Sequence, residues 1–93
     1  MKHHTWSPEK NELLKATRNI CFEDVIFYIE AGGLLNIVNH PNQVKYAEQK
    51  VYVVDIEGYV YLVPFVESDE EVFLKTIIPS HKATKHYLGA NND

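Results

Sequence analysis

Cysteine and long apolar runs are scarce in this chain. Cys21 is the only cysteine, so no disulfide can form within the chain. The longest apolar stretch, 59–66, is interrupted by Pro64 and is far shorter than the ~20 residues of a membrane-spanning helix. The first residues, MKHHTWSPEK, are polar and lack the apolar core of a secretion signal. We therefore expect a cytoplasmic protein with no membrane-spanning segment.

The motifs that mark several enzyme classes are missing too. The chain has no glycine-rich phosphate loop, no Cys-x-x-Cys pair, no His-Glu-x-x-His helix and no Gly-x-Ser-x-Gly elbow. Nothing therefore supports a mononucleotide kinase, a zinc hydrolase or a serine hydrolase. We expect no metal site, because His3 and His4 fall at a mobile terminus and His40 falls in a loop. Cys21 lacks the neighbours of an activated thiol and is expected to be a small buried residue at a helix start.

Length and composition predict one small domain. The chain has 93 residues, of which 45% are apolar, and this suffices for a single core but not for two. We expect the domain to span 1–93, with an ordered core at about 6–88. A domain of this size leaves little room for a large multi-step active site.

Charge is unevenly distributed along the chain, whose formal net charge is −4. Residues 1–18 carry +2 (four Lys and Arg against two Glu), and residues 75–93 also carry +2 (three Lys against one Asp). The segment between them therefore carries −8. If the two ends met in the fold, a basic face would lie on an acidic body and could bind an anion locally. Ordinary solvated helices are the alternative interpretation.

The first third of the chain predicts two helices. Ser7 followed by Pro8 is typical of a helix start, and this helix should run to about residue 17. Its Leu13 and Leu14 are expected to face inward. A second helix should begin near Phe22, where apolar residues recur every three or four positions, and should end at the glycine pair 32–33.

The rest of the chain predicts a small antiparallel sheet and a closing helix, so the expected fold class is α+β. Glu57-Gly58 separates two β-rich runs and is typical of a tight hairpin turn. Pro79 should end the last strand, and the last helix should lie between Ser80 and Gly89. The predicted strands are 34–38, 50–56, 59–66 and 71–78, of which the last three form a meander, and the predicted helix is about 81–88.

The start of the last predicted helix is the segment best suited to chemistry. Free backbone N–H groups at a helix start, together with lysines and imidazoles, can hold an anion such as a phosphate. RNA cleavage without a metal needs a base for the ribose 2′-hydroxyl, cations for the phosphate and an acid for the leaving oxygen, which His, Lys and Tyr can share. The alternative is a surface helix that only packs Ala83, Tyr87 and Leu88 on the sheet. The candidate residues are Ser80, His81, Lys82, Lys85 and His86.

An ordered series of short motifs covers residues 6 to about 88, nearly the whole chain. The motifs are Trp6-x-x-x-Lys10-Asn11, Leu14, Ile20-x-Phe22-Glu23, Glu48-x-Lys50 and Ile77-Ile78-x-x-x-Lys82-Ala83-Thr84. In this order they resemble the BrnT family of bacterial toxins, the toxin halves of type II toxin-antitoxin modules. The resemblance implies a RelE-like fold and a ribonuclease that cuts cellular RNA and inhibits translation, with no metal or other cofactor. It also implies neutralisation by a DNA-binding BrnA-like antitoxin, and a heterotetramer of the two proteins is one assembly that it allows.

The resemblance also implies roles for individual residues. His81 would act in acid/base transfer, and lysines would steady the phosphate. The expected catalytic residues are His81, Lys82 and Lys50. The expected substrate-binding residues are Lys10, from the motif match, and Lys85, His86 and Ser80, from the chemistry of the helix start.

The chain departs from the family pattern at three positions. The family usually has arginine where this chain has Thr76, His81 and Lys50. An arginine holds a phosphate through two parallel hydrogen bonds and is always charged, whereas a histidine is mostly neutral at pH 7. Either the site is rebuilt around His81, Lys82 and Lys50, or the protein binds without cleaving well. A non-catalytic module, which binds a protein partner through its acidic body and apolar sheet, is the rival hypothesis.

Overall fold

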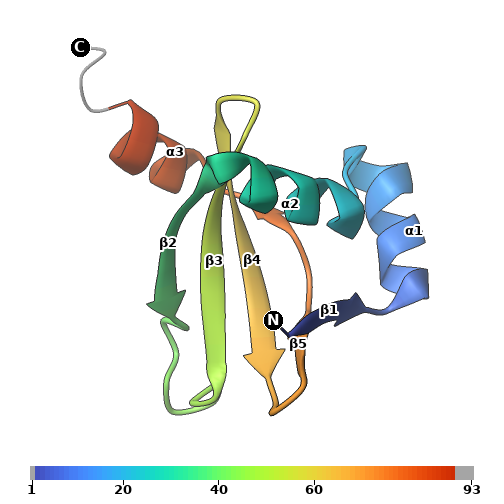
Figure 1. The fold of residues 1–93 in the computed structure, drawn as a ribbon. Coiled ribbons are helices and arrows are strands. Elements are labelled where there is room, and N and C mark those ends of the chain that lie inside the picture. Colours follow the sequence, from blue (N-terminus) through green and yellow to red (C-terminus); the bar gives the residue numbers. More distant parts are fainter. Residues whose placement is uncertain (1, 90–93) are drawn as a thin grey trace.

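Over residues 2–89, which a computed structural model describes, the chain forms three α-helices and a six-stranded mixed sheet (Figure 1). The predicted α+β class is confirmed. The strands lie in the order β1-β5-β4-β3-β2, and β6 pairs with β4. In this part of the chain, no helix is long and apolar enough to cross a membrane. The elements are β1 (His3–Trp6), α1 (Pro8–Arg18), α2 (Phe22–Tyr28), the π-helical turn η1 (Ile29–Gly33), β2 (Leu34–Asn39), β3 (Gln49–Ile56), β4 (Tyr59–Glu67), β5 (Glu71–Leu74), β6 (Ile78–Pro79) and α3 (His81–Leu88).

α1 and α2 confirm the two predicted N-terminal helices. The Ser7 hydroxyl oxygen accepts a hydrogen bond from the Lys10 N–H at 3.2 Å, and Asn19 ends α1 in a left-handed conformation with a φ of 55°. Leu14 is buried, but Leu13 is 53% exposed, so the expectation that both face inward is wrong for Leu13. Neighbouring helical residues point about 100° apart, so only one of this pair can face the core.

β3 and β4 form the predicted hairpin. Glu57 and Gly58 both have a positive φ, 55° and 86°, as a tight two-residue turn requires. The Gly58 N–H also donates to the Asp55 carboxylate at 2.9 Å. β2 confirms the predicted short strand and pairs antiparallel with β3 at the edge of the sheet.

The prediction of one continuous strand over 71–78 is wrong. β5 extends as far as Leu74, which lies opposite Phe65, and the Lys75 N–H still donates to the Pro64 carbonyl at 2.8 Å. The next residue of β4 along this ladder is Pro64, which has no N–H to donate. The chain leaves the sheet there, buries Ile77 fully and returns as β6, whose last residue is Pro79.

β1 is a strand that the sequence analysis did not predict. It pairs in parallel with β5, and His4 lies opposite Val72. The expectation that His3 and His4 fall at a mobile terminus is therefore wrong, because both lie in a paired strand. A polar strand of four residues has little hydrophobic signal, and its partner lies near the other end of the chain.

The main core lies between the sheet and α2, which crosses one face of the sheet in Figure 1. Phe22 and Val25 of α2 are fully buried against this face. The core residues alternate along β3 and β4, because side chains on one face of a sheet recur every second residue. They include Tyr52, Val54, Ile56, Val63 and Phe65.

α3 packs on the opposite face of the sheet. Asn36, Val53 and Leu62 form one row across β2, β3 and β4 on that face. Tyr87 of α3 reaches this row, and its hydroxyl oxygen accepts a hydrogen bond from the Asn36 amide at 3.0 Å. The last helix and the two N-terminal helices are therefore separated by the sheet.

Candidate functional site

α3 is tied to the hairpin by the hydrogen bonds of its first turn. The Ser80 N–H donates to the Val60 carbonyl at 3.0 Å, and the Val60 N–H donates to the Thr84 hydroxyl at 2.8 Å. Thr84 donates in turn to the Ser80 carbonyl at 2.7 Å. The Ser80 hydroxyl caps the helix, because it accepts from the Ala83 N–H at 3.0 Å. Ser80 and Thr84 therefore hold the helix on the sheet.

α3 exposes four basic side chains and contains no acidic residue. These are His81, Lys82, Lys85 and His86, all of which are exposed. Among residues 2–89 the ion pairs are Lys2 with Glu67 and Lys15 with Glu12, so no carboxylate of this region pairs with α3. The helix therefore presents a positive surface that favours a bound anion.

Two shallow grooves flank α3 and divide these four side chains. Lys82 and His86 border one groove, and His81 and Lys85 border the other. Residues four apart lie on the same side of a helix, so each groove has one imidazole and one ammonium group. His81 and Lys82 face different grooves because neighbouring residues point about 100° apart.

Lys50 and Lys10 lie away from α3. The helix is attached at Val60, whose partner in β3 is Asp55. Five strand residues, or about 17 Å, separate Asp55 from Lys50. Lys50 is on the α2 face of the sheet, and Lys10 is on α1. The predicted grouping of these two lysines with the α3 residues is therefore not assembled.

The two basic ends of the chain do not form one face. α1 and α3 lie on different sides of the molecule in Figure 1. Within residues 2–89, the side-chain hydrogen bond that links α1 to the segment before α3 runs from the Arg18 guanidinium to the Ile77 carbonyl, at 2.5 Å. The basic residues of α1 and those of α3 therefore lie on separate surfaces, and the conditional expectation of a joint basic face is not met.

A second cluster of titratable side chains, which the sequence analysis missed, lies on the α2 face of the sheet. His4 Nε2 is 3.3 Å from the Tyr52 hydroxyl oxygen. Tyr52 also stacks on Phe65, with ring centroids 4.1 Å apart. Lys50 precedes Tyr52 by two residues on the same face, about 7 Å along the strand. No sequence signal pointed to this cluster, because it depends on the pairing of β1 with β5.

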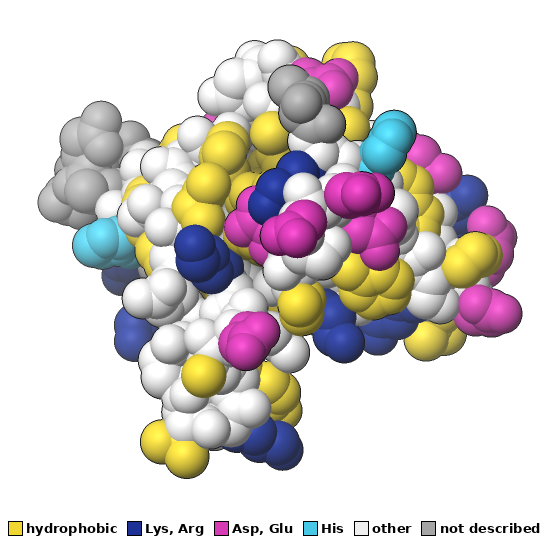
Figure 2. Space-filling model, turned by 60° about the horizontal axis from the view of Figure 1, so that its bottom comes forward, with side chains coloured by type: hydrophobic (Ala, Val, Ile, Leu, Met, Phe, Trp, Pro, Cys, Tyr) yellow, Lys and Arg dark blue, Asp and Glu magenta, His cyan; other side chains and the backbone are white. Residues whose placement is uncertain are grey.

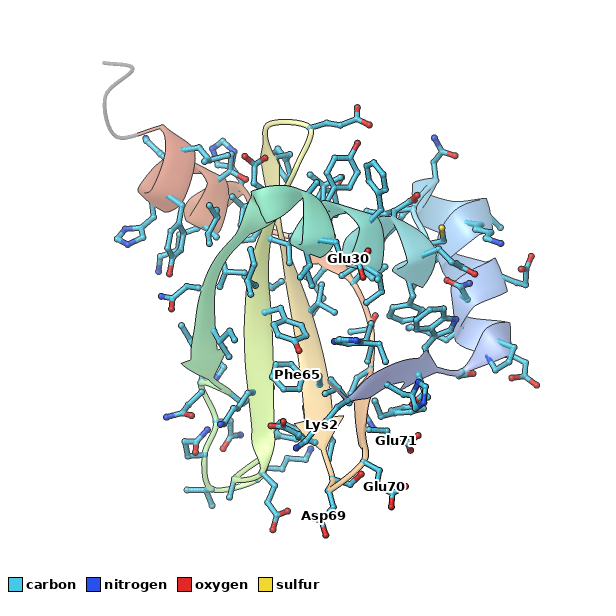
Figure 3. The ribbon with its side chains drawn as sticks, in the orientation of Figure 1. Lys2, Glu30, Phe65, Asp69, Glu70 and Glu71 are labelled. Atoms are coloured by element: carbon cyan, nitrogen blue, oxygen red, sulfur yellow. The ribbon has the colours of Figure 1, made fainter. Side chains whose placement is uncertain are left out.

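Burial changes the pKa values of the His4–Tyr52 pair. Burial lowers the pKa of His4, which the charge of Glu30 partly opposes. Burial also raises the pKa of Tyr52, and the charge of Glu67 adds to this. At neutral pH a neutral imidazole therefore lies beside a protonated phenol, and both shifts disfavour transfer of the phenol proton to the imidazole. Figure 3 shows Glu30, Phe65 and Lys2 on this face of the sheet, below α2.

The stability of the protein should depend on His4 at mildly acidic pH. Because burial lowers the pKa of His4 below its usual 6.5, the unfolded chain binds a proton more readily than the folded chain. The contribution of neutral His4 is therefore present above about pH 6.5 and is lost as the pH falls through the lowered pKa. Between about pH 7.5 and about pH 5.5, the free energy of unfolding measured in urea should fall more for the wild type than for His4→Gln. Equal losses would contradict this assignment.

Several residues of the ordered motif series have structural roles. Trp6 stacks on Phe22, with ring centroids 5.5 Å apart. The Asn11 side chain is buried, accepts from the Phe22 N–H at 2.7 Å and donates to the Glu23 carboxylate at 2.8 Å. Asn11 therefore fastens α1 to the first turn of α2, and the spacing of these residues reflects the packing of two helices.

The turn before β5 forms an acidic patch at one end of the sheet. The exposed acidic residues between the end of β4 and the start of β5 are Glu67, Asp69, Glu70 and Glu71. Figure 2, which brings the bottom of the molecule forward, shows acidic side chains gathered on this surface, and Figure 3 labels three of them. Lys2 forms an ion pair with Glu67 at 2.7 Å. Such a patch repels nucleic acid, so a nucleic-acid surface is better placed on α3.

In the described part of the chain, no group of three or more His, Cys, Asp or Glu residues gathers to hold a metal ion. Comparisons with protein families, with curated proteins and with solved structures find no match to this chain. The basic surface of α3 and the His4–Tyr52 pair are two groups of titratable side chains on opposite faces of the sheet.

Proposed function

We propose that this protein is the toxin half of a type II toxin-antitoxin module, a RelE-like endoribonuclease that cuts cytoplasmic RNA without a metal and so inhibits translation. The observation that carries the proposal is the exposed basic surface of α3, which no carboxylate among residues 2–89 neutralises. The resemblance of the ordered motifs to the BrnT family supports it. The acidic remainder of the chain leaves α3 as the surface best suited to a polyanion.

The reaction needs only side chains of the kinds that α3 carries. A neutral imidazole takes the proton of a ribose 2′-hydroxyl, the 2′-oxygen bonds to phosphorus, and the bond from phosphorus to the 5′-oxygen breaks. The 5′-oxygen leaves with a proton from an ammonium or imidazolium group, and the remaining cations stabilise the crowded phosphate. In this proposal His81 is the acid/base group with Lys85 beside it, and Lys82 and His86 bind the RNA on the other side of the helix.

The protein partner in this proposal is a BrnA-like antitoxin. The simplest neutralisation covers α3, because this blocks RNA and buries the positive surface against a complementary one. A purified complex should therefore leave RNA intact, whether it is a heterodimer or a heterotetramer. A complex that cuts RNA as fast as the free protein would contradict this mode of neutralisation.

Induced expression in a bacterium tests the proposed activity. The wild type should arrest growth and degrade bulk RNA, whereas a His81→Ala, Lys82→Ala double variant should do neither. A His3→Ala, Lys45→Ala double variant is the matched control, because it removes one histidine and one lysine away from α3. This control should arrest growth like the wild type.

The same experiment distinguishes the proposed ribonuclease from the rival hypothesis, a non-catalytic binding module. One structural feature favours that rival: Leu35 and Ile37 are 36% and 48% exposed on the edge strand β2, which contains no charged residue. If soluble wild-type protein changes neither growth nor RNA, the ribonuclease is excluded, and a partner at this edge becomes the better hypothesis. RNA degradation by both double variants would exclude α3 as the site.

A further inference from the structure

The groove on the Lys82 side of α3 has an apolar floor that phosphate binding alone does not use. Its floor is lined by Leu62, Ala83 and Tyr87. Ile78, which is 41% exposed, lies opposite Leu62 in the sheet and extends the apolar surface beside the groove. The groove measures ≈ 280 Å³. This is near the lower end of small-ligand sites, roughly 300 Å³, and suits a single planar group.

The aromatic ring of Tyr87 is held in place. Its hydroxyl oxygen accepts a hydrogen bond from the Asn36 amide at 3.0 Å, which ties α3 to the edge strand β2. The His86 ring packs against it at right angles, with centroids 4.8 Å apart and an interplanar angle of 86°. A ring fixed in this way loses little conformational freedom when a ligand stacks on it, which favours binding.

Lys82 gives the border of the groove a positive charge, and His86 adds an imidazole. Lys82 and His86 lie on it and are exposed, and among residues 2–89 neither forms an ion pair. The site therefore offers an apolar, aromatic floor directly beside an ammonium group and an imidazole. A nucleotide joins the two complementary groups, a planar base and a phosphate, by a short covalent link. Single-stranded RNA is bound in other proteins by this combination of aromatic stacking and cations.

We propose that this groove binds one unpaired nucleobase of a single-stranded RNA, stacked on Tyr87, while Lys82 and His86 hold the adjoining phosphate. The inference rests on the proposed function and deepens it, because it assigns a base-binding subsite to the surface that contacts RNA. The floor residues Leu62 and Ala83 provide no side-chain hydrogen-bonding group, and the Ser80 hydroxyl at the groove already accepts from the Ala83 N–H. The subsite therefore contributes affinity more than sequence preference.

Binding to an uncleavable strand tests the subsite separately from cleavage. The probe is a short fluorescent 2′-O-methyl RNA, which lacks the attacking 2′-hydroxyl, and its competitor is the same strand without bases. By fluorescence anisotropy the wild type should bind the strand with bases at least about five-fold more tightly than the abasic strand. Tyr87→Ala should abolish this difference, and Tyr87→Phe should retain it because the ring is kept. Tyr46→Ala, in the loop before β3, is the matched control and should behave like the wild type.

A second variant keeps the test independent of the bond between Tyr87 and Asn36. Ala83→Leu leaves that bond in place and fills the groove, so it should also abolish the preference for bases. Equal binding of both strands by the wild type would overturn the subsite and leave phosphate binding by α3 intact. A preference that survives both Tyr87→Ala and Ala83→Leu would place the base elsewhere and overturn it too. Failure to bind either strand would overturn the subsite together with the proposed contact between α3 and RNA.

Discussion

The Phe22→Ala variant is expected to unfold with a free energy about 3–5 kcal/mol below that of the wild type. Phe22 is fully buried at the start of α2 and stacks on Trp6. Removing the ring leaves a cavity, because α2 and the sheet cannot close around a side chain of alanine size. Small domains are stable by only about 5–15 kcal/mol, so this variant loses a large part of its stability. Urea unfolding measures the effect as a lower midpoint.

Phe27→Ala is the matched control, since it makes the same truncation on the same helix. Phe27 is 63% exposed, and its replacement should change the free energy of unfolding by no more than about 0.5 kcal/mol. If the two variants lost equal stability, the placement of α2 with Phe22 toward the sheet would be wrong.

The Asn11→Ala variant should lose about 2–4 kcal/mol of folding free energy. The side chain is only 4% exposed and makes two hydrogen bonds, one from the Phe22 N–H and one to Glu23. Its removal leaves the Phe22 N–H without a partner at the buried start of α2, and an unsatisfied buried donor costs more than the bond itself contributed. Thermal and urea unfolding of the purified variant measure the loss.

Glu12→Ala, one residue further along α1, is the control for Asn11. Glu12 is exposed and pairs only with Lys15 at 3.2 Å, so its replacement should cost about 0.5 kcal/mol or less. An Asn11→Ala protein with wild-type stability and no RNA cleavage would instead make Asn11 part of the active site.

Elements that a few neighbouring residues decide were predictable. Ser7 and Ser80 cap their helices as expected, because a side-chain oxygen satisfies a free N–H two or three residues later. The Glu57-Gly58 turn follows from the backbone conformation that a two-residue hairpin requires. The basic character of α3 is likewise a local property of its eight residues.

Pairing between distant segments was not predictable in the same way. β1 is a strand only because it pairs in parallel with β5. Its own four residues have almost no hydrophobic pattern that would predict a strand. The interruption of the predicted strand after Leu74 depends on Pro64. Because Pro64 belongs to the neighbouring strand, the residues 71–78 by themselves do not predict the interruption. The placement of Leu13 in solvent follows from the orientation of α1 on the core.

Residues close together in the chain decide the α+β class, most helix and strand positions and the unbroken basic surface of the last helix, so these features could be predicted. Which titratable groups meet depends instead on tertiary packing. It placed Lys50 with Tyr52 and His4 on one face of the sheet, and it placed α3 with its apolar groove on the other. The physical reason is that strand register and helix packing bring together segments whose separation in the chain is unrelated to their distance in the fold.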